Sequence, residues 1–176
     1  VYDGKHVSIY DYPEVRDRVI LLEGHSKTYA MTGWRLGYAA MPVDLAAQIS
    51  KLQTNSNSCT ASFTQIAGIE ALTGPQDESL KMMAEFKARR DLIVDGLNDI
   101  PGFSCLKPKG AFYVFPNITG TGRKSKELEE FLLEEAGVAG LSGTSFGKYG
   151  EGYLRFSYAN SQENIRKALE MIRKVI

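Results

Sequence analysis

Two cationic side chains, Lys27 and Arg35, lie on one short segment that also carries several hydroxyl groups. A lysine amine condenses with an aldehyde only in its neutral form, so the reaction needs surroundings that lower the pKa of the amine. An arginine binds a phosphate through a planar pair of N–H donors, and a hydroxyl such as that of Ser26 can add a hydrogen bond. For an isolated lysine and arginine, two solvated charges in a glycine-rich turn are the commoner explanation.

The segments on either side of these cations predict two strands. The apolar run at 19–22 leads directly into Gly24, and the run at 36–41 is ended by Pro42. Both runs are apolar throughout, which is typical of strands buried on both faces. We therefore expect Lys27 and Arg35 to lie between two core strands, where partial burial would lower the pKa of the lysine.

A second arginine, Arg155, lies in a segment with the two-residue period of a strand. Leu154, Phe156 and Tyr158 would point to one side of this strand and Arg155 to the other. A planar guanidinium binds a carboxylate through two parallel hydrogen bonds, which fix orientation as well as charge. A charge on the solvated face of a strand is the commoner fate of such a residue, and the alternation is compatible with both interpretations.

The remaining segments predict an α/β protein. Apolar residues recur at helical spacing in segments at about 45–52, 63–67, 75–97, 125–137 and 161–176. Pro75 suits a first helical position, Gly137 a helix end and Ser161 an N-cap. The polar stretch at 54–60 predicts a loop, and short strands are expected at about 103–106, 111–115, 138–141 and 153–158.

The composition excludes several classes of protein. Hydrophobic residues make up 43% of the chain and charged residues 24%, which is ordinary for a globular protein. The 21 basic residues balance 21 acidic ones, so nucleic acid and anionic membranes are not expected partners. Cys59 and Cys105 form no close pair of the kind that binds zinc, and no apolar run is long enough to cross a bilayer. We expect no metal site and a cytoplasmic location.

Three strings of the sequence resemble one family. The string SKTYAMTGWRLGY at 26–38 closely resembles the Schiff-base-lysine signature of fold-type-I aminotransferases in the aspartate and aromatic aminotransferase group. The string GYLRFSYA at 152–159 is similar to the family segment with the arginine that binds the substrate carboxylate. The string KGAFYVF at 109–115 resembles the strand whose aromatic residue lines the substrate pocket. The resemblance covers nearly the whole chain.

The resemblance implies pyridoxal 5′-phosphate as the cofactor and a role for five residues. Lys27 would form the Schiff base and then move a proton between the substrate and the cofactor. Arg35 and Ser26 would bind the cofactor phosphate. Arg155 would bind the α-carboxylate of the substrate, and Phe112 would line the pocket, although core packing is a serious alternative for Phe112.

The resemblance also implies a domain organisation. Residues 1–74 would be the last part of the fold-type-I large domain that binds the cofactor, 75–98 an interdomain helix, and 99–176 the small C-terminal α/β domain. Members of the family are longer, so this chain is expected to be a C-terminal portion with little or no activity alone. The full-length protein would be a homodimer that exchanges an amino group between an amino acid and a 2-oxo acid.

Two other functions are compatible with the same residues. A carbon–sulfur lyase of the same fold also uses the Schiff-base lysine and the carboxylate arginine. The sequence MTGWR at 31–35 favours the aminotransferase. The chain could instead be a non-catalytic, aminotransferase-like domain of a regulator. The sequence alone leaves the preferred amino acid undetermined.

Overall fold

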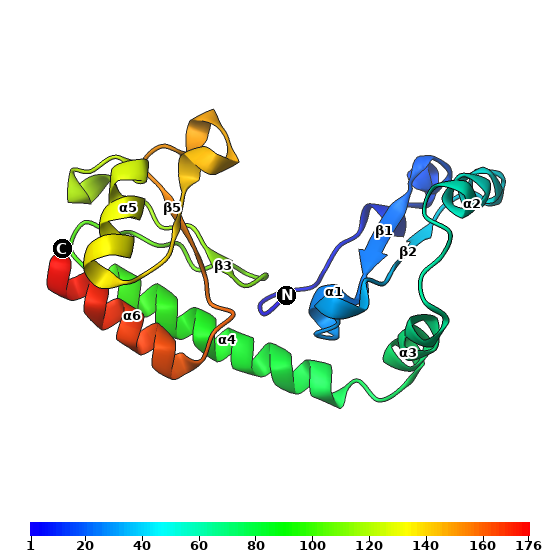
Figure 1. Ribbon diagram of the computed structural model, residues 1–176, viewed down its shortest axis with the longest axis horizontal. Coiled ribbons are helices and arrows are strands. Elements are labelled where there is room, and N and C mark those ends of the chain that lie inside the picture. The colour runs from blue at the N-terminus through cyan, green and yellow to red at the C-terminus, as the bar shows by residue number, and fades with distance from the viewer. The chain divides into compact units, whose positions relative to one another are not determined.

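The computed structural model describes all residues, Val1–Ile176, and the chain is an α/β protein that folds as two compact units. One unit consists of Lys5–Lys81, and the other joins Val1–Gly4 to Met82–Ile176. The change from one unit to the other falls within the long helix α4, Asp77–Asn98 (Figure 1). The functional domain boundaries at 74 and 98 stay a prediction. None of the helices is both long enough and apolar enough to span a bilayer.

The unit Lys5–Lys81 is built around a pair of antiparallel strands, in which Leu21 lies opposite Ala40 and Gly24 opposite Gly37. A side chain at Gly37 would bring its Cβ within 2.8 Å of the Glu23 carbonyl oxygen, so this close pairing requires glycine. The helices and strands of this unit are β1 Leu21–Gly24, α1 His25–Thr28, β2 Gly37–Ala40, α2 Val43–Ser56 and α3 Ser62–Thr73, with 3-10 turns at Ile9–Asp11, Pro13–Arg18 and Thr32–Trp34.

Two predictions for this unit were wrong. The strands are not buried: the Leu22 side chain is 76% exposed, because within these 176 residues no layer covers the two-stranded sheet. The stretch at 54–60 is not wholly a loop, since α2 continues to Ser56. Thr54 and Asn55 lie in the last turns of α2, and their polar side chains donate to the carbonyls of Ser50 and Lys51 four residues earlier, at 2.9 and 2.8 Å.

The C-terminal unit has a three-stranded antiparallel sheet with the order β3-β5-β4, and helices α4, α5 and α6 pack with it around one core (Figure 1). Helices α4 and α6 approach closely at Gly96, where any Cβ would overlap the Leu169 side chain. The further elements of this unit are β3 Tyr113–Val114, α5 Ser125–Ala136, β4 Leu141–Ser142, β5 Leu154–Ser157 and α6 Gln162–Val175, with 3-10 turns at Thr119–Thr121, Gly143–Phe146 and Lys148–Gly150.

The alternation predicted for the strand around Arg155 is confirmed. Leu154, Phe156 and Tyr158 are buried in the core, and Arg155 points to the other face. The core contains side chains from α4, α5, α6 and β5 in a single cluster. Burial of this apolar surface is the main source of stability for the unit.

The ends of the last two helices were also predicted correctly. Ser161 caps α6, since its hydroxyl accepts from the backbone N–H of Asn164 at 3.1 Å. Gly137 ends α5 with φ 63°, a left-handed conformation that glycine adopts without strain.

Three other boundaries were not predicted correctly. Pro75 lies before the helix rather than in it, because α4 begins at Asp77. The strand expected at 103–106 does not form: only Ser104 makes a bridge, with Asn117. The side-chain oxygen of Asn98 accepts from the backbone N–H of Cys105 at 2.7 Å, and its amide nitrogen donates to the Cys105 carbonyl at 3.0 Å. The Asn98 side chain thus replaces a strand partner for Cys105. The strand expected at 138–141 is only partly found: β4 is Leu141–Ser142, which shares Leu141 with the expected range.

The buried face of α5 provides a direct test of the core. Leu132→Ala should lower the free energy of unfolding of the C-terminal unit by about 3 kcal/mol, because the truncation removes buried contacts and leaves a cavity. The neighbouring Leu133 is 56% exposed, so Leu133→Ala should change it by less than about 0.5 kcal/mol. Urea unfolding followed by circular dichroism measures both, and equal effects would contradict the assigned helix face.

Candidate functional site

Lys27 lies on the single helical turn α1, which follows β1 without a loop. The backbone N–H of His25 donates to the carbonyl of Leu36 at 3.2 Å, and this bond ties the start of the turn to the end of the segment that carries Arg35. The Lys27 side chain is exposed, so the partial burial expected from the sequence is not found. The reason is the uncovered sheet beside it. The amine is in none of the ion pairs of the structure.

Arg35 follows the 3-10 turn Thr32–Trp34 and has left-handed backbone angles, φ 52° and ψ 48°. This conformation costs a non-glycine residue of order 1 kcal/mol and reverses the chain before β2 begins. The guanidinium donates one hydrogen bond, from Nη1 to the carbonyl of Thr32 at 2.9 Å. Its other N–H groups are free to bind an anion. Ser26, half-buried, adjoins Lys27 on the same turn.

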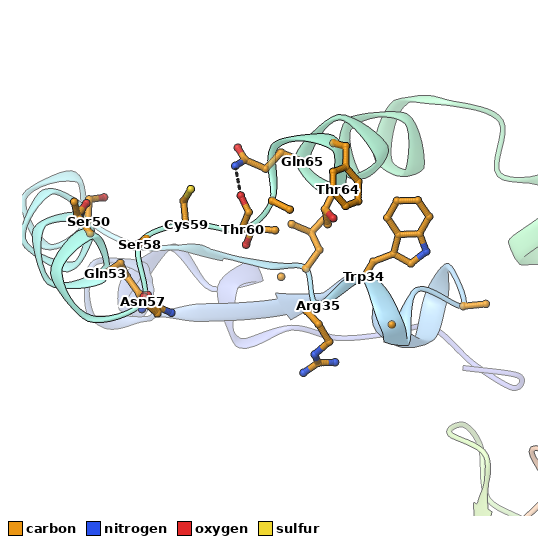
Figure 2. A pocket seen from close by; sticks show the side chains of 17 residues that line it. Trp34, Arg35, Ser50, Gln53, Asn57, Ser58, Cys59, Thr60, Thr64 and Gln65 are labelled. Atoms are coloured by element: carbon orange, nitrogen blue, oxygen red, sulfur yellow. Dashed lines mark hydrogen bonds between the residues drawn. The ribbon is translucent and has the colours of Figure 1, made fainter.

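A cavity of about 1050 Å³ also opens in this unit, lined by Arg35 and uncharged residues such as Trp34, Cys59 and Phe63. Figure 2 shows that the guanidinium of Arg35 points away from the side chains of Trp34 and Thr64. Only the backbone side of Arg35 therefore borders this cavity. A phosphate bound by the Arg35 guanidinium would lie elsewhere.

Arg155 lies in the C-terminal unit, on the central strand β5, directly opposite Leu141 of β4. Its guanidinium carbon is 4.4 Å from the centre of the Tyr113 ring and 4.4 Å from that of Phe146. The two aromatic rings hold the planar group by cation–π contacts. Arg155 is half-buried and takes part in none of the ion pairs. Its N–H groups are consequently available to a carboxylate.

Phe112 precedes β3 and is half-buried against the core. Its ring centre is 4.5 Å from that of Tyr113 and 6.0 Å from that of Phe86. The packing interpretation of Phe112 thus has direct support, while Tyr113 contacts Arg155. Sequence reasoning missed Tyr113 and Phe146. The signal for Tyr113 was its two-residue spacing from Phe115, which places both on one face of a strand.

The approach to β5 is fixed by Glu151 and Ser125. The Glu151 carboxylate accepts from the backbone N–H and the hydroxyl of Ser125, at 2.9 and 3.2 Å, and from the N–H of Gly152 at 3.2 Å. The buried Ser125 hydroxyl accepts in turn from the N–H groups of Gly152 and Tyr153, at 2.8 and 3.1 Å. The hydrogen bond from the Ser125 backbone, with the others, lowers the pKa of Glu151 below its ordinary value. These bonds tie the start of β5 to the N-terminus of α5.

Comparison with protein families gives the context for both groups of residues. The family model for aminotransferases of class I and II matches residues 2–172, nearly the whole chain. This chain belongs to the class I and II aminotransferase family. The resemblance found in the sequence is thereby confirmed. The five candidate residues of this aminotransferase chain all lie inside the matched range: Ser26, Lys27, Arg35, Phe112 and Arg155.

Several relatives of this aminotransferase chain are closely similar in sequence. The aspartate aminotransferase of Pyrococcus horikoshii is 45% identical over 181 residues, which cover 99% of this chain and 44% of the relative. The probable N-acetyl-LL-diaminopimelate aminotransferase of Bacillus subtilis is 42% identical over 171 residues, which cover 97% of this chain and 43% of the relative. The chain therefore spans less than half the length of these relatives.

Solved structures of aminotransferases share the fold. The aromatic aminotransferase from Pyrococcus horikoshii matches with a TM-score of 0.93 and 41% identity, over 98% of this chain and 47% of that one. The aspartate aminotransferase from Rhizobium meliloti matches with a TM-score of 0.94 and 38% identity, over 99% of this chain and 46% of that one. The α/β fold class expected from the sequence is confirmed.

The two groups of candidate residues in this aminotransferase chain belong to different compact units. Ser26, Lys27 and Arg35 lie within Lys5–Lys81. Ser26 and Lys27 lie on α1, directly after β1, and Arg35 lies in the segment that leads into β2, the partner of β1. Arg155 and Phe112 lie within the C-terminal unit, where Tyr113 joins them. Each group presents cations that are not neutralised by carboxylates.

Removal of the Glu151 charge should make the C-terminal unit less stable at neutral pH. Because the folded state lowers the pKa of Glu151, its contribution is fully present above the ordinary value of 4.5 and is lost as the pH falls through the lowered value. Glu151→Gln should therefore differ most from the wild type at pH 7, the difference should begin to shrink below the ordinary pKa of 4.5, and the two should converge only below the lowered pKa. A urea-unfolding series over pH measures this, and a difference that does not change with pH would contradict the assignment.

Proposed function

We propose that the complete gene product is a pyridoxal-phosphate-dependent aminotransferase that exchanges an amino group between an amino acid and a 2-oxo acid, with aspartate-like substrates. One observation carries the proposal: the chain presents an exposed lysine and arginine on one segment and a second arginine held between aromatic rings, all without carboxylate partners. Relatives named aspartate aminotransferase, at 45% and 42% identity, support the choice of substrate class.

The donor set of the first unit fits pyridoxal phosphate. The Lys27 amine suits its aldehyde carbon, and the free N–H groups of Arg35 with the Ser26 hydroxyl suit its phosphate. No carboxylate pairs with either cation, so an anionic group would meet no repulsion from a direct partner. When bound, the cofactor supplies an electron sink for negative charge at the substrate α-carbon.

The residues of the chain then have separate tasks. The Nζ atom of Lys27 accepts the proton that leaves the substrate α-carbon, as a general base. Arg155 binds the α-carboxylate through two parallel N–H groups, while Tyr113 and Phe146 keep its plane in one orientation. Phe112 contributes the wall next to Tyr113.

The transferase is preferred to the two other functions that the sequence allows. The relatives named above are aminotransferases, and neither a lyase nor a regulator is among them. No observation on the structure favours elimination over transfer. The alternatives therefore serve as outcomes of the test.

The organisation of the whole protein is part of the proposal. We propose that residues 1–74 belong to the cofactor domain, 75–98 to a connecting helix and 99–176 to the small domain. A cytoplasmic homodimer is proposed as the working form. It is supported by the apolar side chains that α3 leaves exposed, which further chain or a second copy would cover: Phe63, Ile66, Ile69 and Leu72.

The proposal is tested by incubating the complete gene product with amino acids and 2-oxo acids. A new amino acid is expected, and ammonia in its place would indicate the lyase. Arg155→Lys should raise KM about 10- to 100-fold, because it loses the parallel pair of charged hydrogen bonds. Arg173→Lys, an exposed position on α6, is the matched control. Equal KM values for the two variants would contradict the role of Arg155.

A further inference from the structure

The loop before β3 has an unusual backbone. Ala111 has φ 64°, in the left-handed region, although it is not glycine. Such a conformation is unfavourable for an L-residue with a Cβ, and it persists where surrounding contacts impose it. The next two residues are Phe112 and Tyr113, so the angle at Ala111 sets the direction in which both aromatic rings leave the loop.

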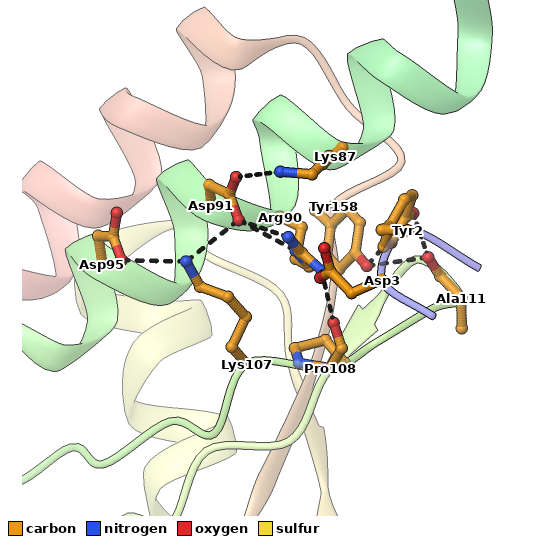
Figure 3. Close-up of polar contacts among 10 residues, drawn as sticks. All are labelled: Tyr2, Asp3, Lys87, Arg90, Asp91, Asp95, Lys107, Pro108, Ala111 and Tyr158. Carbon is orange, nitrogen blue, oxygen red and sulfur yellow. Dashed lines mark hydrogen bonds and ion pairs between the residues drawn. The ribbon is translucent and has the colours of Figure 1, made fainter. Parts of the chain in front are cut away.

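Two tyrosine hydroxyls converge on the carbonyl of Ala111. Tyr158 donates to it at 2.9 Å, and Tyr2 donates to it as well (Figure 3). The backbone N–H of Tyr2 also donates to the carbonyl of Lys109, at 2.7 Å. A carbonyl oxygen has two lone pairs, so both tyrosines can be accommodated at once. The segment Val1–Gly4 belongs to the same compact unit as this loop.

A buried arginine fixes the other end of the loop. Arg90 of α4 is 1% exposed, and its Nη1 donates to the carbonyl of Pro108 at 2.9 Å and to the carboxylate of Asp3. Its Nε and Nη2 donate to Asp91 at 3.0 and 2.8 Å. The ring of Tyr2 lies 4.9 Å from the guanidinium carbon. Arg90 therefore holds both the loop and the segment that carries Tyr2, as Figure 3 shows.

The charges around Arg90 are balanced. Desolvation opposes ionisation of Asp91, but hydrogen bonds from Arg90, Lys107 and Lys87 lower the pKa of Asp91 to about 2. A buried guanidinium is costly unless it is paired and its donors are satisfied. Of the partners of Arg90, the carbonyl of Pro108 belongs to the loop and Asp3 to the segment that carries Tyr2, so pairing this guanidinium also ties both segments to α4.

The loop connects this network to Arg155. Tyr113 lies opposite Ser157 of β5 in the sheet. Arg155 is two residues before Ser157 on the same strand, so all three side chains lie on one face of the sheet. The centre of the Tyr113 ring is 4.4 Å from the guanidinium carbon of Arg155. A change at Ala111 would move this ring. We propose that Tyr2 and Arg90 are positioning residues for the substrate carboxylate, because they hold Ala111 in its left-handed conformation and so keep Tyr113 against Arg155. The inference rests on the proposed function only for the identity of the carboxylate.

The conservative variant Tyr2→Phe removes one hydroxyl and leaves the ring beside Arg90. In the complete gene product, it should raise KM for the amino acid and the 2-oxo acid about fivefold, the effect of one lost hydrogen bond, with kcat nearly unchanged. Ala111→Gly should restore KM in the Tyr2→Phe background, because glycine adopts a positive φ without strain. Tyr149→Phe is the matched control, since Tyr149 is 86% exposed.

A spectroscopic readout separates this inference from the proposed function. With isotope-labelled arginine, the Nε–H resonance of Arg155 should show the ring-current shift expected between two aromatic rings, and Tyr2→Phe should reduce this shift. Ala111→Gly should return it. If the gene product transfers no amino group but the resonance responds in this way, the proposed function fails and the positioning inference stands.

The opposite results would overturn the inference. A Tyr2→Phe variant with lower stability but the same KM and the same Arg155 resonance would show that Tyr2 has only a structural role. Failure of Ala111→Gly to restore either readout would show that the left-handed backbone is not the link. Arg90→Lys provides a second variant. It keeps the positive charge but loses the planar set of N–H donors that binds several partners at once. It should change KM and the Nε–H resonance of Arg155 in the same direction as Tyr2→Phe.

Discussion

The C-terminal unit depends on the alternation of side chains along strand β5. Leu154 and Phe156 enter the core, so the pleat turns Arg155 to the opposite face, where β3 brings Tyr113 beside it. A shift of the strand by one residue would bury the guanidinium and expose the two apolar side chains. The hydrophobic core therefore fixes the direction of the arginine, and stability and binding geometry are set by the same alternation. Mutations of these core residues should therefore change the orientation of the Arg155 side chain.

The features that the sequence predicted well are those determined by neighbouring residues. The cap of α6 at Ser161 and the end of α5 at Gly137 follow from local hydrogen bonding and backbone freedom, and both are observed. The alternation around Arg155 is also local. The strings around Lys27 and Arg35 led to the correct family because the types and order of their residues are distinctive, although their burial was predicted wrongly.

The features that were missed depend on residues far apart in the sequence. Burial of the strand at β1 requires a covering layer, which an apolar run does not reveal. The hydrogen bond from the Tyr2 hydroxyl to the Ala111 carbonyl joins residues 109 positions apart in the sequence. The contact of Phe146 with Arg155 joins a 3-10 turn to strand β5. The strand expected at 103–106 failed because the Asn98 side chain offered the backbone other partners. The spacing of apolar residues does not reveal that a side chain will compete with a neighbouring strand for backbone hydrogen bonds.

The central claim is that Lys27 carries the cofactor, within an enzyme whose substrate carboxylate is bound by Arg155. Both cations stand without carboxylate partners, and each lies in a different compact unit. The most direct test is to add pyridoxal phosphate to the complete gene product, reduce it with borohydride and locate the modified lysine by peptide mass spectrometry. The account predicts a pyridoxyl phosphate adduct on Lys27 that Lys27→Ala removes. An adduct on a different lysine, or none on Lys27, would contradict it.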